Sequence, residues 1–301
     1  MPPRKPQKKP NKLKHWRKLL FFHGMRVGLA ASARVAPNLA TRWAMRLFAT
    51  PYGPRHIRLN HLEIPAFTER HIPLRSSRRQ HKLRLYVWGD PVQQPTVLLV
   101  HGWSGWGLQL SQFVTPLLAA GFSVAAVDMP AHGHSSGHNA HFFSWLDALR
   151  EASKQFPKLH TIIGHSLGGA TLGYALAQGL VVPQAVLIGA PADLLAELNK
   201  FSAQLWLPKG FGDRMANTWN QQLGKVVQEV RAETGHISGA IRGLLVHDRN
   251  DNLVPMTDMY RYQRVWPGAK TLITEGLGHT RLLKDPNTIQ QIVNWLTSNQ
   301  I

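Results

Sequence analysis

The sequence contains no cysteine among its 301 residues. Disulfide bonds and thiolate metal sites are therefore excluded, and the absence favours a reducing compartment. The chain also lacks any uninterrupted run of about 18 apolar residues, the length that a membrane-spanning helix requires. These two absences argue against a disulfide-stabilised secreted domain and against an integral membrane protein, and they favour a cytoplasmic location.

Acidic residues are missing from the first fifth of the chain. Residues 1–62 hold 14 Lys and Arg and no Asp or Glu, whereas residues 63–301 hold 21 against 16. Of the formal net charge of +19, +14 therefore lies in the N-terminal segment. Residues 1–18, with four prolines and eight basic residues, are predicted to form a disordered tail. Residues 19–55 are predicted to form a basic amphipathic helical segment with a break near Pro37.

Three interpretations of this segment remain open. Residues 1–48 are suited to an anionic membrane surface, where Lys and Arg add binding free energy. Helices that pack on the body of the protein beside a solvated tail are an equally simple reading. Nucleic acid is an unlikely partner because no base-reading motif accompanies the charge. A secretory signal is disfavoured because His23, Gly24 and Arg26 interrupt the apolar segment. The sequence does not indicate an oligomeric state.

From residue 56 to residue 301, short apolar runs alternate with helical patterns. Ile57–Ile64 and Leu83–Trp88 alternate in polarity and are predicted to be half-buried antiparallel strands. Continuous apolar runs predict buried strands at 96–100, 124–127, 159–164, 185–188 and 243–247, and 270–274 is a further candidate strand. Helices are predicted at 108–120, 142–156, 166–179 and 286–297. This order predicts an α/β fold with a mostly parallel central sheet and helices on both faces.

Residues 192–242 interrupt the alternation, because they contain no obvious strand. They are rich in apolar and aromatic side chains and follow the predicted strand 185–188. We interpret them as a helical lid inserted into the α/β domain. Ordinary packing of long connecting helices is the alternative.

The string Gly164-His165-Ser166-Leu167-Gly168 lies between a predicted strand and a predicted helix. Glycines on both sides allow the tight turn that presents a serine at its apex. The following helix N-terminus supplies positive partial charge and N–H groups that favour an oxyanion. This context predicts a nucleophilic Ser166, with the Leu167 N–H as an oxyanion donor; a serine that only caps the helix is the alternative.

A second glycine-rich loop, His101–Gly107, follows the predicted strand 96–100. Its backbone can approach a ligand closely, so the Trp103 N–H is the natural second oxyanion donor. The alternative is a tight strand-to-helix turn without a further role. His101, Trp106, His165 and Trp206 are predicted to line a substrate pocket.

Histidines and acids follow three other strands. His132, His134, His138 and His141 suggest a metal site, but nothing nearby completes a ligand set, so no metal and no cofactor are predicted. His279, between a strand and the last helix, is the best-placed general base. Either Asp248 or Asp251 can orient it, because a neutral serine needs a base and a carboxylate that fixes the tautomer of that base.

The chain resembles the α/β-hydrolase superfamily, in particular its serine esterase, lipase and acyl-peptidase-like branch. The resemblance spans about Leu83 to Leu296. It rests on His101-Gly102, Asp128-x-Pro-x-His132-Gly133-x-Ser135, Gly164-x-Ser166-x-Gly168, Asp251-x-x-Val254-Pro255 and Gly278-His279. It implies a triad of Ser166, Asp251 and His279, with Asp251 as the acid because Val-Pro follows it. Ala131 departs from the glycine usual in the second motif.

The expected activity is hydrolysis of a carboxylic ester or thioester through an acyl-enzyme on Ser166, with small-molecule ester or acyl substrates and a preference for lipophilic acyl groups. A peptidase or acyltransferase with the same triad is one alternative. A membrane-associated binding protein that has lost the activity is the other.

Overall fold

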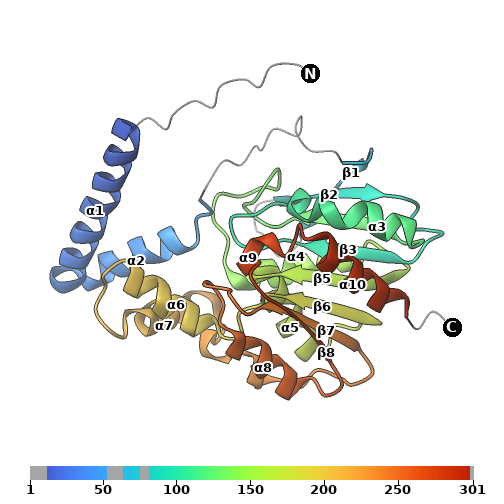
Figure 1. The fold of residues 1–301 in the computed structure, drawn as a ribbon. Helices are drawn as coiled ribbons and strands as arrows, with labels where there is room; N and C mark the ends of the chain where they lie inside the picture. The colour runs from blue at the N-terminus through green and yellow to red at the C-terminus, as the bar shows by residue number, and fades with distance from the viewer. Residues whose placement is uncertain (1–11, 53–63, 75–80, 299–301) are drawn as a thin grey trace. The chain divides into compact units, whose positions relative to one another are not determined.

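The computed structural model describes residues 12–52, 64–74 and 81–298 (Figure 1). The chain forms two compact units. The first combines Met1–Phe48 with Leu195–Val227, and the second combines Ala49–Leu194 with Gln228–Ile301. Residues from the N-terminal segment and from the inserted segment therefore belong to the same unit. Among the described residues, no helix has the length and apolarity needed to cross a membrane.

The second unit is built on one eight-stranded sheet in the order β1-β2-β4-β3-β5-β6-β7-β8. β1 pairs antiparallel with β2, β2 pairs antiparallel with β4, and all other neighbours are parallel. This arrangement confirms the predicted mostly parallel α/β sheet. The strands are β1 (Thr68–Leu74), β2 (His81–Trp88), β3 (Thr96–Val100), β4 (Ser123–Asp128), β5 (Leu159–His165), β6 (Gln184–Ile188), β7 (Arg242–Asp248) and β8 (Lys270–Thr274).

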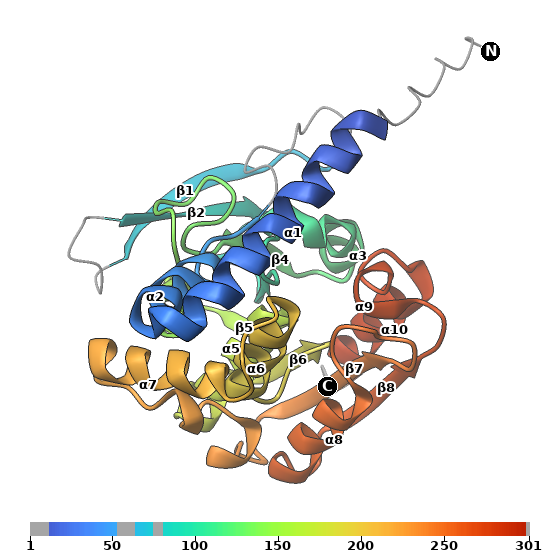
Figure 2. The same ribbon diagram turned by 90° about the vertical axis from the view of Figure 1, so that its left-hand side faces the viewer.

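Helices cover both faces of this sheet (Figures 1 and 2). Those of the second unit are the 3-10 helix η2 (Gly107–Phe113), α3 (Val114–Ala119), α4 (Phe142–Ser153), α5 (Leu167–Ala177), η3 (Val227–Glu229), η4 (Ala232–Thr234), α8 (Met256–Val265), α9 (Gly278–Arg281) and α10 (Pro286–Thr297). α3 contacts α10, and α4 contacts α5. The expected single helix over 108–120 is instead η2 followed by α3.

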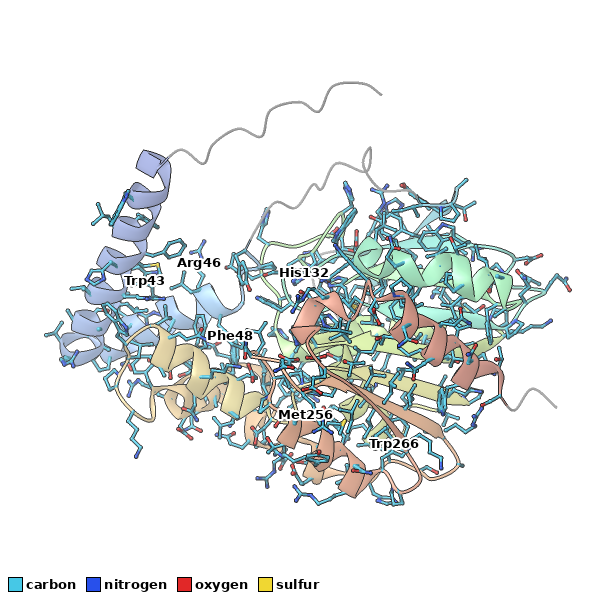
Figure 3. All side chains as sticks on the ribbon, viewed as in Figure 1. Trp43, Arg46, Phe48, His132, Met256 and Trp266 are labelled. Carbon is cyan, nitrogen blue, oxygen red and sulfur yellow. The ribbon has the colours of Figure 1, made fainter. Side chains whose placement is uncertain are left out.

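Alternate residues of each buried strand belong to two different cores. Val97 and Leu99 of β3 pack with the side chains of η2 and α10, such as Phe113 and Ile292. Leu98 and Val100 pack in the other core, which includes Trp145 of α4 and Leu172 of α5. Trp266 is buried in the same core as Leu98 and Val100, and its indole N–H donates to the carbonyl of Ile241 (Figure 3). Because successive side chains of a strand point to opposite faces, a continuous apolar run is needed to fill both layers.

From residue 12 on, the first unit contains four helices: α1 (Lys12–Val35), α2 (Pro37–Phe48), α6 (Leu194–Gln204) and α7 (Phe211–Leu223). α1 packs on α2, and α2 packs on α7. Phe48 of α2 meets Phe201 and Trp219 edge-on, with ring centroids 5.0 and 5.7 Å apart. The Arg214 guanidinium donates to the Thr41 hydroxyl at 2.9 Å. Aromatic side chains of the insertion thus form the interior of this unit together with the N-terminal helices.

Several boundaries differ from those expected. α1 begins at Lys12, inside the stretch predicted to be disordered, because no proline lies between Pro10 and Pro37 to interrupt it. Pro37 is the first residue of α2, the helix position at which its missing N–H matters least. β1 was not expected, since Pro73 lies within it; as an edge strand it tolerates a proline. The strand predicted at Ile57–Ile64 falls almost wholly outside the described residues.

The glycines around Ser166 are required by close packing. A Cβ added to Gly168 would lie 2.4 Å from the carbonyl oxygen of His101 and 2.6 Å from that of Val100. A Cβ on Gly164 would lie 2.6 Å from the carbonyl oxygen of Gly168. Any side chain at either position would force α5 away from the ends of β3 and β5.

We therefore expect Gly168→Ala to lower the free energy of unfolding by about 2–3 kcal/mol through overpacking against the backbone. Chemical denaturation of the full chain measures it. Gly239→Ala is the matched control, because a Cβ there would meet only the Pro267 carbonyl oxygen, at 3.9 Å. Equal unfolding free energies for the two variants would contradict this account of Gly168.

Candidate active site

Ser166 forms the turn between β5 and α5, with φ 54° and ψ −121°. A positive φ is uncommon for a residue with a side chain, and surrounding packing has to hold it. The Ser166 N–H donates to the carbonyl of Ile188 at 2.9 Å, which ties the turn to β6. This strained strand–turn–helix geometry is the one in which a serine acts as a nucleophile. Leu167 is the first residue of α5, where N–H groups have no acceptor within the helix.

The loop after β3 touches Ser166 directly. A Cβ added to Gly102 would lie 2.9 Å from the Ser166 Cβ, so the bare backbone of the loop packs on the serine. Trp103 follows this contact, and its ring meets the His132 ring edge-on at a centroid distance of 4.8 Å. Ser104 then turns the chain with a φ of 57°. The Trp103 N–H, predicted to be an oxyanion donor, is thus one residue away from the contact with Ser166.

The loop after β4 holds the loop after β3 in place. Three hydrogen bonds connect them: Met129 N–H to His101 Nε2 at 3.0 Å, Ser104 N–H to His132 Nε2 at 3.0 Å, and Gly107 N–H to Asp128 Oδ1 at 2.6 Å. Each imidazole donates from Nδ1 to a nearby carbonyl, His101 to Gly102 and His132 to Pro130, which leaves Nε2 as the acceptor. Burial lowers the pKa of His101 to about 4, so this acceptor persists near neutral pH.

Asp128 is a completely buried carboxyl at the end of β4. Besides Gly107 N–H, it accepts hydrogen bonds from the Tyr86 hydroxyl at 2.9 Å and from His134 N–H at 2.8 Å. Burial raises the pKa of Asp128, although the hydrogen bonds from Gly107, His134 and Tyr86 oppose it. Ala131, where the resemblance leads one to expect glycine, has a φ of 67°. The turn therefore keeps its left-handed backbone despite the side chain.

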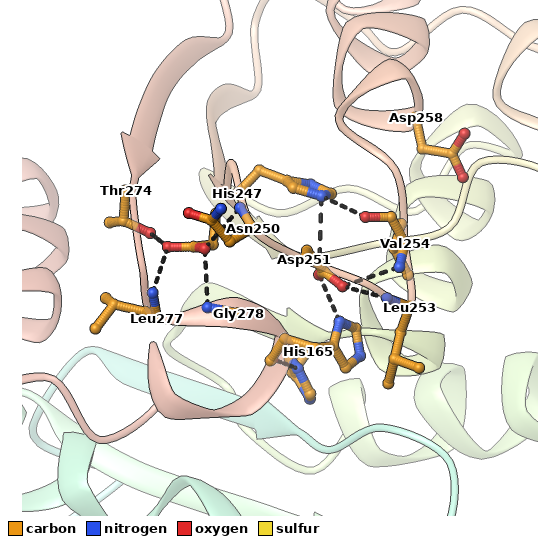
Figure 4. A network of polar contacts seen from close by, with 12 residues as sticks. His165, His247, Asn250, Asp251, Leu253, Val254, Asp258, Thr274, Leu277 and Gly278 are labelled. Carbon is orange, nitrogen blue, oxygen red and sulfur yellow. Dashed lines mark hydrogen bonds and ion pairs between the residues drawn. The ribbon is translucent and has the colours of Figure 1, made fainter.

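His279 and Asp251 are joined by a short hydrogen bond. His279 Nδ1 donates to Asp251 Oδ2 at 2.7 Å, which leaves Nε2 of the ring as an acceptor (Figure 4). Asp251 Oδ1 accepts from the N–H groups of Leu253 and Val254. Burial alone would raise the pKa of Asp251, but these hydrogen bonds, that from His279 foremost, bring it below its usual value. His279 itself lies in the short helix α9 and not in the open loop that we expected.

Asp248, the other acid that the sequence left open, organises the loop that leads to His279. It is completely buried at the end of β7. Its carboxylate accepts hydrogen bonds from the Thr274 hydroxyl and from three N–H groups, those of Asn250, Leu277 and Gly278 (Figure 4). Burial would raise the pKa of Asp248, but these hydrogen bonds lower it below its usual value. Asp248 therefore positions the residue before His279, while Asp251 contacts the imidazole.

Two further histidines support the same region. His165 Nε2 donates to the carbonyl of His279 at 2.9 Å, and the two rings lie 4.7 Å apart. Because Ser166 follows His165, this bond brings the nucleophile and the base candidates to one edge of the sheet. His247 is buried, donates from Nε2 to the Val254 carbonyl, and lies 3.8 Å from Asp251 Oδ2. The sequence analysis did not single out His247, and no motif marks it.

The structure shows the contacts of the four residues that were predicted to line a substrate pocket. His101 has no exposed surface, and its ring holds two loop backbones together. Trp106 is buried in the hydrophobic core that contains Phe113. His165 is buried beneath His279. Trp206 belongs to the first unit, where its ring contacts His23 and Arg26. Apolar packing and loop hydrogen bonds therefore account for His101 and Trp106, while a pocket role of Trp206 stays a prediction.

The candidate metal-binding histidines also have identified hydrogen bonds. His132 accepts from Ser104 N–H, and His141 accepts from Ser144 N–H as the N-cap of α4. Burial lowers the pKa of His141. In the described part of the chain, no group of three or more His, Asp or Glu side chains is placed to hold a metal ion.

The network around Asp248 leads to a prediction about pH. The folded-state pKa of this carboxyl is below its unfolded value of about 3.9, so its stabilisation is complete well above that pH and is lost as the pH falls through the folded pKa. We expect Asp248→Asn to lower the free energy of unfolding by about 1–3 kcal/mol at pH 7, because buried donors lose an ionic acceptor. The difference from the wild type should shrink at pH 3.

Urea unfolding at the two pH values measures this difference. Glu275→Gln is the control, since Glu275 is exposed in the same connection between β8 and α9. A gap between wild type and Asp248→Asn that is as large at pH 3 as at pH 7 would show that the charge of Asp248 does not provide the stabilisation.

Comparison with known proteins relates this site to a family. Curated relatives include a Drosophila melanogaster protein named "Probable serine hydrolase", 38% identical over 97 residues that cover 29% of this chain and 28% of that protein. A pimeloyl-[acyl-carrier protein] methyl ester esterase of Aromatoleum aromaticum is 34% identical over 99 residues, covering 33% of this chain and 38% of that enzyme. The chain thus spans less than half of the length of each of these relatives.

Solved structures show the same fold. An esterase of Pyrococcus furiosus superposes with a TM-score of 0.57 at 21% identity, over 83% of this chain and 97% of that chain. At this identity the likeness concerns the fold alone. The model of the alpha/beta hydrolase family matches residues 97–289, a range that runs from β3 to α10 and includes Ser166, Asp251 and His279. The chain belongs to the alpha/beta hydrolase family.

Proposed function

We propose that this protein is a serine hydrolase that cleaves carboxylic esters or thioesters through an acyl-enzyme on Ser166. Two observations carry the proposal together: the strained backbone of Ser166, and the hydrogen bond from His279 Nδ1 to the buried carboxylate of Asp251. His165, the residue before Ser166, connects them, because its ring lies 4.7 Å from the His279 ring. A hydroxyl is a weak nucleophile until a base takes its proton, and this pairing supplies such a base. The names of the curated relatives, a serine hydrolase and a methyl ester esterase, support the same reaction class.

In the proposed reaction, His279 Nε2 takes the proton of the Ser166 hydroxyl as its oxygen attacks the acyl carbon. The carbonyl π bond opens, and the resulting oxyanion is stabilised by the N–H groups of Trp103 and Leu167. The imidazolium, stabilised by Asp251, then protonates the leaving alcohol or thiol as its bond to the acyl carbon breaks. Water, deprotonated by His279, attacks the acyl-enzyme, and the serine leaves with the proton.

The insertion between β6 and β7 is proposed to act on substrate selection. The connection starts after the carboxyl end of β6, the edge at which parallel α/β sheets bind their ligands. The chain length and apolar content of this insertion favour a lipophilic acyl group over a small polar one. We also propose that the enzyme works on the surface of an anionic membrane, given the positive charge of residues 1–48.

The triad is tested with a fluorophosphonate probe on the purified full chain. We expect the wild type to be labelled and Ser166→Ala to be unlabelled, with kcat for a nitrophenyl ester reduced at least 10⁴-fold, as is typical when a triad member is lost. Asp251→Asn should reduce kcat by about 10⁴-fold because the imidazole loses the group that fixes its tautomer. Asp90→Asn, an exposed loop substitution, is the control.

Several outcomes separate the alternatives. Labelling without ester turnover, together with acyl transfer to an added alcohol or amine, would replace hydrolysis by an acyltransferase reaction. Cleavage of acyl-peptides in preference to esters would favour a peptidase. A folded wild type that reacts with neither probe nor esters would contradict the proposal and favour a binding protein.

The hydrogen bond from Ser104 to His132 leads to a further prediction. His132→Phe keeps a ring against Trp103 and Trp145 but removes the acceptor of the Ser104 N–H. We expect kcat to fall by about tenfold or more with little change in KM, since the oxyanion donors act only on the transition state. The affinity for a boronate inhibitor, which carries a tetrahedral anion, should fall in parallel.

Two controls accompany this measurement. His132→Gln, which retains an acceptor, should keep more activity than His132→Phe, and His138→Phe changes an exposed histidine of the same loop. A normal boronate affinity in folded His132→Phe would show that His132 does not position the oxyanion loop.

A further inference from the structure

The first unit carries most of the positive charge of the protein. Met1–Phe48 holds 12 Lys and Arg, and Leu195–Val227 holds four, against only Glu197 and Asp213. This unit therefore has a formal charge of +14, and the second unit has +5. The inserted segment does not neutralise the N-terminal helices; it adds to their charge. Such a field attracts anionic partners and repels a second copy of the same surface.

The same unit also exposes large apolar side chains. Among the described residues, 15 large apolar side chains are exposed, and ten of them belong to this unit. Trp16, Leu20 and Val27 of α1 are 62%, 68% and 50% exposed. Their spacings of four and seven residues place them on one face of the helix. We call these three residues the α1 stripe.

Near its C-terminal end, α1 packs through the opposite side. Leu29 and Ala33, about 40° apart around the helix, have 0% and 8% of their surface exposed, whereas Phe22, seven residues before Leu29, is 42% exposed. The α1 stripe therefore points away from the side on which Leu29 and Ala33 pack. Arg34, seven residues after Val27, extends the same face with an exposed cation. In the sequence, four of the first seven residues of α1 are Lys or Arg.

α2 repeats this combination. Leu39 and Trp43, one helical turn apart, are 55% and 39% exposed, and Arg42 and Arg46 are exposed beside them. Figure 3 shows Trp43, Arg46 and Phe48 along this helix. Phe48 belongs to the aromatic interior, whereas Arg46 lies about 200° away from it around the helix axis. α2 thus packs through one side and presents cations with apolar side chains on the other.

Trp206 links the insertion to α1. It holds a φ of 60°, a strained backbone conformation for an aromatic residue, and is 45% exposed. The His23 ring meets it edge-on at 4.9 Å, and the Arg26 guanidinium lies 5.5 Å from its centre. An exposed Trp beside an arginine is typical of proteins that lie at a lipid–water interface.

We infer that α1 is a docking helix for an anionic lipid surface, with the α1 stripe inserted between headgroups and the arginines of α1 and α2 paired with lipid phosphates. The combination decides the partner class: polyanions such as nucleic acid need the cations but gain little from exposed Leu and Val, whereas a bilayer uses both. The inference deepens the membrane part of the proposed function. It is independent of the chemistry at Ser166.

The test uses the full chain carrying Ser166→Ala, so that failure of the proposed hydrolase activity cannot affect it. Binding is measured by co-sedimentation with vesicles of phosphatidylglycerol and phosphatidylcholine, and with phosphatidylcholine alone. We expect binding only to the anionic vesicles and weakening of it by salt. Arg34→Gln with Arg42→Gln should weaken it about thirtyfold, because each cation contributes about a fivefold factor near such a surface.

The apolar contribution is tested separately. Trp16→Ser, Leu20→Ser and Val27→Ser together should weaken vesicle binding by at least about tenfold, because exposed apolar area is no longer transferred into the bilayer. All three side chains are exposed, so folding should be retained. The matched controls lie in the second unit: Val92→Ser, Val181→Ser and Tyr260→Ser for the apolar set, and Lys270→Gln with Lys284→Gln for the charged set.

Three results would overturn the inference. The first is vesicle binding that the serine substitutions in the α1 stripe and their control substitutions in the second unit weaken equally. The second is binding to an RNA homopolymer that is as tight as vesicle binding and unaffected by the serine substitutions, which would assign the charge to nucleic acid. The third is a dimer in sedimentation velocity that the α1 substitutions dissociate, which would make this face an interface between copies.

Discussion

Close packing of α5 against the end of β3 is the constraint on which the rest of the candidate site depends. Gly168 meets the carbonyl groups of Val100 and His101 at distances that leave no room for a side chain. This contact places the turn at Ser166 directly on Gly102, so the proposed nucleophile and the loop with the Trp103 N–H are fixed to each other by close packing of their backbones. The strained φ of Ser166 persists because these surroundings leave it no relaxed alternative.

Buried carboxyl groups at strand ends then fix the loops that carry the chemistry. Asp128 ends β4 and accepts from the loop after β3, and Asp248 ends β7 and accepts from the loop before His279. Neither is a member of the proposed triad. Each binds two or more N–H groups of irregular backbone, which would otherwise be costly to bury, to one carboxyl group. In the candidate site, Asp128 and Asp248 thus bind loop backbone, whereas Asp251 contacts the imidazole of His279.

Local patterns predicted the sheet and the positions of Ser166 and His279, because strand runs, flanking glycines and their order along the chain are all contained in short stretches. Residue spacing alone did not separate Asp248 from Asp251, since both follow the same strand. The family resemblance favoured Asp251, and the hydrogen bonds to the loop and to the imidazole distinguish the two acids. His101 and Trp106 show a second limit of prediction from local sequence patterns. The direction of their side chains depends on the course of a loop set by Asp128, a residue more than twenty positions away.

Pairing of the N-terminal helices with the insertion was beyond any local pattern. The residues that meet, such as Phe48 with Trp219 and Arg214 with Thr41, are about 170 positions apart in the sequence. Because the two segments form one unit, their positive charges have to be counted together. A unit whose only role was to pack would be more stable with acids among its cations, since like charges repel across a compact body. Sixteen cations against two acids in this unit are the excess charge that the inferred anionic lipid surface would compensate.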